Sequence, residues 1–123
     1  MKLAVVDDDN DVRTAISRLL RAMGHEVSAF GSAEALETAF VAVDCAIVDV
    51  RLPGRSGFEV REWLRGLQPP VPAVLISGDG HRGDPGMAAN LLVSKPFDVE
   101  SLVTAIRIAT STAMSDAKPH ACS

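Results

Sequence analysis

The sequence contains 123 residues, of which 47% are hydrophobic and 23% are charged, and its formal net charge is -4. This length supports one domain with a single packed core, and the composition is that of a soluble globular protein. The acidic balance argues against direct nucleic-acid binding, which depends on basic charge. Cys45 and Cys122 do not form an evident disulfide pair, so we expect a reduced, cytoplasmic compartment. No apolar run approaches the roughly 20 residues of a membrane span and the N-terminus lacks a signal-peptide pattern, so we expect no membrane partner.

Five short apolar runs predict β-strands. Residues 3–6, 45–48, 73–76 and 91–93 are apolar without alternation, which is typical of strands covered on both faces of a parallel sheet. Residues 26–30 have a weaker pattern, and we expect this strand at an edge of the sheet.

Apolar residues at helical spacing occupy most of the intervals between these strands. Gly24 ends the first predicted helix and Ser32 caps the second. Pro69 and Pro70 close the third helix, and Asp98 caps the last. The inward stripes of the four helices are Val12, Ala15, Ile16, Leu19, Leu20 and Met23; Leu36 and Phe40; Val60, Trp63, Leu64 and Leu67; and Val99, Leu102, Val103 and Ile106.

The alternation of strands and helices predicts a doubly wound α/β fold, in which ligands bind at the carboxyl ends of the parallel strands. The segment 78–90 contains five glycines or prolines, which are unfavourable inside a helix, so we expect the fourth helix to be short or missing. We assign one domain to residues 1–112 and a flexible tail to residues 113–123, because the tail lacks helical periodicity.

Polar residues follow four of the predicted strands. Asp7 and Asp8 follow the first strand, Asp49 the third, Ser77 the fourth and Lys95 the last. Each alone has an ordinary explanation, such as a helix cap, a turn or a solvated charge. Two carboxylates about 4 Å apart repel by roughly 4 kcal/mol at an effective dielectric of 20, so clustered acids need a cation, a shared proton or water. Because all four strand ends lie on one edge of a parallel sheet, we interpret these residues as one site.

Four motifs, VVDDD, IVDVRLPGRSG, LISG and VSKPF, resemble those of the response-regulator receiver domain of two-component signalling. The resemblance covers most of the chain and implies a flavodoxin-like, five-stranded parallel sheet in strand order 2-1-3-4-5. It also implies that Asp7 and Asp8 are the acid pair and that Asp49 is the phosphoryl acceptor. Ser77 and Lys95 would be the hydroxyl and the ammonium group that contact the phosphoryl group.

The same resemblance implies a Mg²⁺ ion held by Asp8, Asp49 and the backbone carbonyl of Arg51, with Asp7 acting through water. Such an ion would neutralise the acidic cluster, since Mg²⁺ prefers oxygen ligands. Asp49 would accept a phosphoryl group from a sensor histidine kinase or a histidine phosphotransfer protein, and the domain would signal by conformational change to an unidentified downstream protein. Because residues 113–123 are too few for an output domain, we expect a stand-alone receiver or one isolated from its output domain.

Two features depart from the family pattern. Leu92 occupies the position of the family's aromatic switch residue, and the chain contains no tyrosine. Lys95 follows Ser77 by 18 positions, a shorter spacing than is typical of the family. A switch needs a bistable element, and our hypothesis assigns that role to the glycine-rich segment 78–86.

Two alternative functions are also consistent with the sequence. A phosphohydrolase of the haloacid dehalogenase type combines an aspartyl nucleophile with Ser or Thr and Lys, and would use Asp7 as nucleophile and Asp9 as acid. Such enzymes need a further acidic motif after the lysine, whereas Asp98 and Glu100 are better explained as the start of a helix. The other alternative is a non-switching, receiver-like binding module, because Leu92 weakens the switch while the pocket remains complete.

Overall fold

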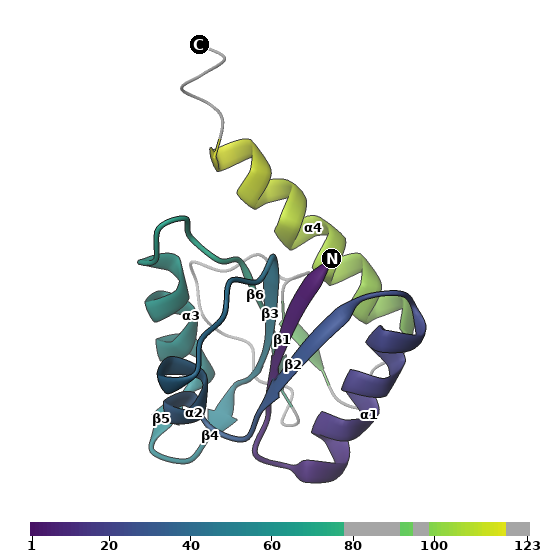
Figure 1. Ribbon diagram of the computed structural model, residues 1–123, viewed down its shortest axis with the longest axis vertical. Coiled ribbons are helices and arrows are strands. Elements are labelled where there is room, and N and C mark those ends of the chain that lie inside the picture. The colour runs from purple at the N-terminus through teal and green to yellow at the C-terminus, as the bar shows by residue number, and fades with distance from the viewer. Residues whose placement is uncertain (78–91, 95–98, 118–123) are drawn as a thin grey trace.

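The computed structural model describes residues 1–77, 92–94 and 99–117. Figure 1 shows a central sheet with helices on both of its faces. The strands of this sheet are β1 (Lys2–Val6), β2 (Glu26–Phe30), β3 (Cys45–Asp49), β6 (Ala73–Ser77) and β7 (Leu92–Ser94). A small hairpin consists of β4 (Arg51–Leu52) and β5 (Arg55–Ser56), and the helices are α1 (Asn10–Ala22), α2 (Ala33–Thr38), α3 (Gly57–Arg65) and α4 (Val99–Ala117).

The main sheet is parallel throughout and has the order β2-β1-β3-β6-β7. Since β6 and β7 are the fourth and fifth strands of the predicted sheet, the predicted order 2-1-3-4-5 is confirmed. The edge position predicted for residues 26–30 is also confirmed, because β2 pairs with β1 alone in this sheet. The expected short or missing fourth helix concerns residues 78–90, which lie outside the described residues.

The sheet separates two hydrophobic cores. Helices α1 and α4 cover one face of the sheet, and α2 and α3 cover the other (Figure 1). Successive side chains of each strand point to opposite faces, so both cores draw on the same strands. The first core includes Leu3, Val5, Ile16, Leu20, Ile47, Val74 and Leu102, and the second includes Val6, Leu36, Val48, Val60, Leu64 and Leu75. Burial on both faces explains why the central strands are continuously apolar.

Two helices on the second face begin at serine caps. Ser32 caps α2, as the sequence predicts, and its hydroxyl accepts a hydrogen bond from the Ala35 N–H at 3.0 Å. Ser56 and Glu59 form a reciprocal capping box at the start of α3. The Glu59 N–H donates to the Ser56 hydroxyl at 3.3 Å, and the Ser56 N–H donates to Oε1 of Glu59 at 2.9 Å. The start of α3 is therefore fixed next to the loop that follows β3.

Three residues of the predicted inward stripes are exposed, and these assignments were wrong. Ala15 and Met23 lie at the margin of the α1 stripe, and Met23 is already the C-cap of the helix. Val99 is 47% exposed because α4 reaches the sheet only at Leu102, which is fully buried. Asp98, the predicted cap of this helix, lies outside the described residues.

The last helix extends beyond the predicted end of the domain. The sequence predicts that the domain ends at residue 112, whereas α4 continues to Ala117. The prediction stopped earlier because the last residues of this helix have no clear apolar stripe. The division into a domain at 1–112 and a flexible tail at 113–123 stays a prediction. In the part of the chain that the structure describes, no helix combines the length and the hydropathy that crossing a membrane requires.

Candidate functional site

An acidic site forms where two neighbouring parallel strands end. Strands β1 and β3 are paired, with Val6 opposite Val48, so Asp7 after β1 lies beside Asp49 at the end of β3. Carboxylate oxygens of Asp7, Asp8 and Asp49 lie within 4.8 Å of one another. Asp7 is fully buried and Asp49 is 6% exposed, whereas Asp8 is exposed to solvent. The structure thus brings together the three carboxylates that the sequence singled out.

Backbone and side-chain contacts fix the position of Asp7. Its N–H donates to the carbonyl of Phe30 at 3.1 Å, and its Oδ1 accepts a hydrogen bond from the Asp9 N–H at 2.9 Å. Its own carbonyl accepts a hydrogen bond from Nη1 of Arg13 at 2.8 Å. Asp7 is therefore held at both its backbone and its carboxylate, next to the exposed side chain of Asp8.

Asp9 has a structural role that differs from that of its acidic neighbours. Its Oδ1 accepts hydrogen bonds from the Asp11 N–H at 2.9 Å and the Val12 N–H at 3.2 Å, which makes it the N-cap of α1. A negative charge at this position is also favoured by the helix dipole. This engagement argues against Asp9 as the catalytic acid that a dehalogenase-type phosphohydrolase would need.

The backbone around Asp49 is tightly fixed. The Arg51 N–H donates to Oδ1 of Asp49 at 2.9 Å, and the Val50 N–H donates to the Ile76 carbonyl at 2.8 Å, which continues the pairing with β6. Gly57 packs against this turn so closely that a Cβ atom there would lie 2.4 Å from the Asp49 carbonyl oxygen. Only glycine fits such a position, so Gly57 sets the path of the chain past Asp49.

The chain between Asp49 and α3 forms the hairpin of β4 and β5. Gly54 adopts a left-handed conformation in its turn, with φ of 77°, which glycine adopts without steric cost. The guanidinium of Arg55 forms an ion pair with Glu37, which connects the hairpin to α2. The chain after Asp49 therefore turns back on itself as a short antiparallel hairpin.

Ser77 ends β6, one position beyond the residue paired with Asp49, and it is 3% exposed. It thus lies on the strand adjacent to the acidic cluster, at the same edge of the sheet. Lys95 lies outside the described residues, but Ser94, which precedes it, pairs with Ser77. Strand β7 therefore ends at the same edge of the sheet as β6.

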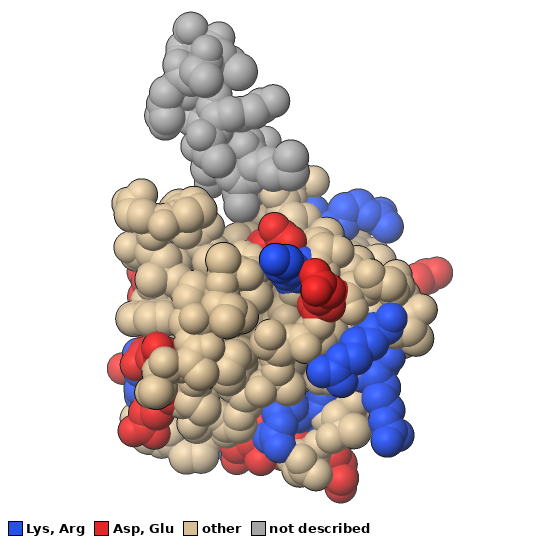
Figure 2. Space-filling view, viewed as in Figure 1, with Lys and Arg blue, Asp and Glu red and all other residues tan. Residues whose placement is uncertain are grey.

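The donor set suits a hard divalent cation. Mg²⁺ takes oxygen ligands in an octahedron with bonds of about 2.1 Å, so opposite ligand atoms lie about 4.2 Å apart. Carboxylate oxygens within 4.8 Å of one another meet this requirement when one of them acts through a water molecule. Figure 2 shows acidic side chains at the lower edge of the molecule, where Figure 1 places the end of β1. A cation at this edge would offset the repulsion between the carboxylates.

A sequence profile of the response regulator receiver domain matches residues 3–107. The chain belongs to the response regulator receiver family. Asp7, Asp8 and Asp49 are thus the acidic pocket of a receiver domain, of the type that binds Mg²⁺ in this family. Receiver domains take part in two-component signalling, in which they interact with histidine kinases.

Two curated relatives illustrate the similarity of this receiver domain to known response regulators. It is 39% identical over 118 residues to the response regulator protein TmoT of Ectopseudomonas mendocina, covering 89% of this chain and 52% of TmoT. It is 40% identical over 113 residues to nodulation protein W of Bradyrhizobium diazoefficiens, covering 86% of this chain and 49% of the relative. The chain thus spans about half the length of the curated relatives it matches.

Solved structures show the same fold. The response regulator StyR superposes with a TM-score of 0.81 at 28% identity, over 98% of this chain and 64% of StyR. A CheY-like receiver domain from Methanospirillum hungatei superposes with a TM-score of 0.78 over 94% of this chain and 97% of that protein. Its identity is 20%, so this second likeness concerns the fold alone.

Arg13 is a contact of the site that the sequence did not predict. The signal in the sequence is its position: Arg13 lies in the first turn of α1, four residues after Asp9, where a long basic side chain can reach the loop before the helix. The carbonyl that the guanidinium would reach depends, however, on the path of the backbone between β1 and α1. Only the folded structure reveals that this carbonyl belongs to Asp7.

Proposed function

We propose that Asp49 of this receiver domain accepts a phosphoryl group from a phosphohistidine of a sensor histidine kinase or a histidine phosphotransfer protein. The observation that carries the proposal is the group of three carboxylates, Asp7, Asp8 and Asp49, whose oxygens lie within 4.8 Å of one another at one edge of the sheet. The Asp49 carboxylate accepts a hydrogen bond from the Arg51 N–H, and Gly57 packs against the Asp49 carbonyl oxygen, so both the side chain and the backbone of Asp49 are fixed.

In this reaction a carboxylate oxygen of Asp49 attacks the phosphorus atom of the donor. The new O–P bond forms as the N–P bond of the phosphohistidine breaks, and the histidine nitrogen leaves with the electron pair and takes up a proton. The product is an aspartyl phosphate on Asp49. Because phosphoryl transfer depends on positioning and on charge stabilisation, the fixed backbone of Asp49 contributes directly to it.

Asp8, Asp49 and the backbone carbonyl of Arg51 would hold Mg²⁺, with Asp7 acting through water. When bound, the ion supplies positive charge for the oxygens of the phosphoryl group. Asp7, which is buried and fixed by its hydrogen bonds, would add negative charge to the pocket. Support for this assignment comes from the donor set, which consists of oxygen atoms.

Ser77 would donate a hydrogen bond to the transferred phosphoryl group, and the ammonium of Lys95 would stabilise its charge. The location of Ser77 on the strand next to β3 supports this role. The downstream partner would be a protein that distinguishes the phosphorylated from the unphosphorylated domain. With Leu92 in place of the aromatic switch residue, the response would start at the segment after Ser77.

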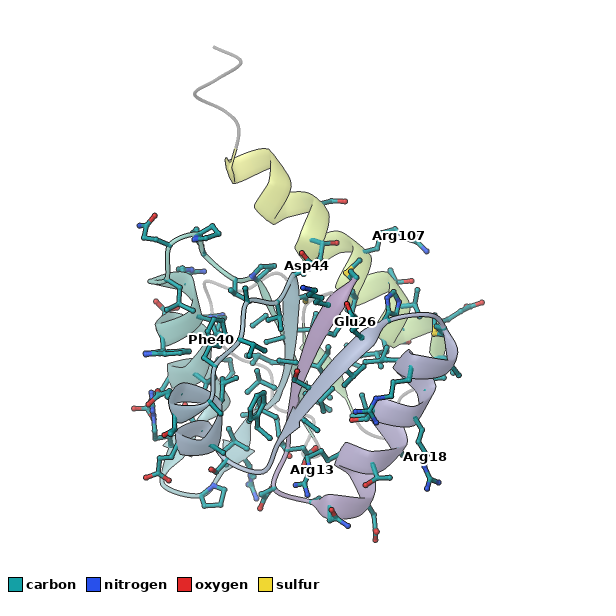
Figure 3. The ribbon with its side chains drawn as sticks, viewed as in Figure 1. Arg13, Arg18, Glu26, Phe40, Asp44 and Arg107 are labelled. Carbon is teal, nitrogen blue, oxygen red and sulfur yellow. The ribbon has the colours of Figure 1, made fainter. Side chains whose placement is uncertain are left out.

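The test is to incubate the protein with acetyl phosphate and Mg²⁺, trap the product with borohydride and locate the modified residue by mass spectrometry. Asp49→Asn should abolish the label. Asp44→Asn is the matched control, because it removes the same charge just before β3, at the opposite end of the strand (Figure 3). It should leave the label unchanged.

Two other outcomes would overturn the proposal. Label on Asp7 would indicate a phosphohydrolase of the haloacid dehalogenase type. A folded protein that acquires no label with Mg²⁺, either from acetyl phosphate or from a phosphorylated histidine phosphotransfer protein, would indicate a binding module with an inactive acceptor.

A further inference from the structure

Arg13 joins the acidic loop to the first helix. Its Nη1 donates to the backbone carbonyl of Asp7 at 2.8 Å, and its Nη2 donates to Oδ1 of Asn10 at 2.7 Å. Figure 3 shows Arg13 near the end of the first strand, whereas Arg18 extends away from the body of the molecule. The two guanidinium nitrogens thus bridge the residue before Asp8 and the first residue of α1.

The same guanidinium also contacts the loop after β2. A Cβ atom on Gly31 would lie 3.2 Å from Nη1 of Arg13, and Phe30, which precedes Gly31, accepts the hydrogen bond of the Asp7 N–H. Arg13 is partly buried in this position. Arg13 therefore lies beside the loop after β2 and binds the carbonyl of the Asp7–Asp8 peptide in the loop after β1.

We propose that Arg13 is a positioning residue, which orients the Asp7–Asp8 peptide so that the Asp8 carboxylate points into the acidic pocket. This inference rests on the proposed function, in which Asp8 is a ligand of Mg²⁺. The contact of Arg13 is with a backbone carbonyl and leaves the exposed Asp8 side chain to face the pocket. Hydrogen bonds from a charged donor are stronger than neutral ones, so a single guanidinium can fix this short loop.

The positioning role and a simple charge effect predict opposite results. A cation close to the pocket repels Mg²⁺, so charge alone predicts that loss of Arg13 tightens Mg²⁺ binding. Loss of positioning predicts weaker binding, because Asp8 then samples orientations that do not reach the pocket. Partners that orient metal ligands typically change metal affinity by about 10-fold to 100-fold. We therefore expect the positioning effect to exceed the charge effect.

The experiment is a calorimetric titration of the unphosphorylated protein with Mg²⁺ alone. Arg13→Ala should weaken Mg²⁺ binding by about tenfold. Asn10→Ala, which keeps the charge but removes one anchor of the guanidinium, should weaken it less and in the same direction. Arg13→Lys keeps the charge and one donor, and should recover part of the affinity. Arg18→Ala is the matched control, because it removes the same charge from an exposed position of α1 and should not weaken binding.

The result is interpretable whichever step fails. If the wild-type protein does not bind Mg²⁺, the proposed function is wrong and the inference falls with it. If the wild type binds Mg²⁺ and Arg13→Ala binds it equally or more tightly, only the role of Arg13 is refuted. A urea unfolding curve for each variant separates positioning from folding, because a purely structural residue would lower the unfolding midpoint without changing the Mg²⁺ affinity of the folded protein.

Discussion

Gly57→Ala tests how strictly the fold fixes the position of Asp49. The added Cβ would lie 2.4 Å from the Asp49 carbonyl oxygen, 2.8 Å from Cα of Val50 and 2.9 Å from the Asp49 carbonyl carbon. An ordinary contact begins at 3.4 Å, so the two backbones must separate by about 1 Å. All three atoms belong to the backbone, and no side-chain rotation can relieve the overlap.

The expected cost follows from two opposing effects. Overpacking in a tight interior costs about 1–3 kcal/mol, and the higher helix propensity of alanine returns at most about 1 kcal/mol. We expect Gly57→Ala to lower the free energy of unfolding by about 2 kcal/mol. It should also slow labelling of Asp49 more than stability alone explains, because a displacement of about 1 Å at a reacting group can reduce a rate by about 100-fold.

Urea unfolding monitored by the fluorescence of Trp63 is a suitable assay. Trp63 is the only tryptophan, lies on α3 and packs edge-on against Phe40 with ring centroids 5.6 Å apart. Gly66→Ala is the matched control at the other end of α3, since its nearest neighbours would be at 3.6 Å. A Gly57→Ala protein as stable as Gly66→Ala, with normal labelling of Asp49, would refute the packing argument.

Three further predictions concern the metal, a helix cap and the buried thiol. At ten times its Kd, Mg²⁺ should raise the free energy of unfolding by about 1.4 kcal/mol, and EDTA should remove this effect. Asp8→Asn should abolish most of the stabilisation by Mg²⁺, whereas Asp44→Asn should keep it. Equal stabilisation of both variants by Mg²⁺ would contradict a metal site at Asp8. Ser56→Ala should lower the unfolding free energy by about 1 kcal/mol, because it removes the hydroxyl that accepts the Glu59 N–H; an unchanged urea midpoint would exclude a stabilising cap. Burial raises the pKa of the Cys45 thiol from 9.0 to about 12, so the folded protein retains this proton more strongly than the unfolded chain. The contribution of the Cys45 proton to the free energy of unfolding is complete below pH 9 and is lost as the pH rises toward 12. The wild type should therefore lose more stability between pH 9 and 11 than Cys45→Ala. Parallel profiles of unfolding free energy against pH would argue against a raised pKa of this thiol.

The strands and the acidic cluster followed from local signals in the sequence, whereas the strand order followed from the resemblance to receiver domains. Strands with two buried faces have continuous apolar runs, such as residues 45–48, and such runs are easy to recognise. Asp7 and Asp49 come directly after or at the end of such strands, so their proximity follows from parallel topology. Ser77 follows from the same reasoning on the adjacent strand.

Other features depend on tertiary packing, which the pattern does not encode. Helical periodicity places Val99 on the inward stripe, but the helix begins before it reaches the sheet, so Val99 is exposed. The need for glycine at position 57 comes from the approach of α3 to the end of β3. The bond from Arg13 to the Asp7 carbonyl likewise depends on the path of a loop, which residue types alone do not specify.

The strand that carries Asp49 lies in the interior of the sheet, with β1 on one side and β6 on the other, and its pairing with β6 continues past the aspartate through the Val50 N–H. Backbone in such a location opens to solvent only when the whole domain unfolds. A segment that opens only globally cannot serve as a hinge. Asp49 therefore lies at a fixed point of the domain, and if it accepts a phosphoryl group as proposed, the rearrangement that follows must take place around it.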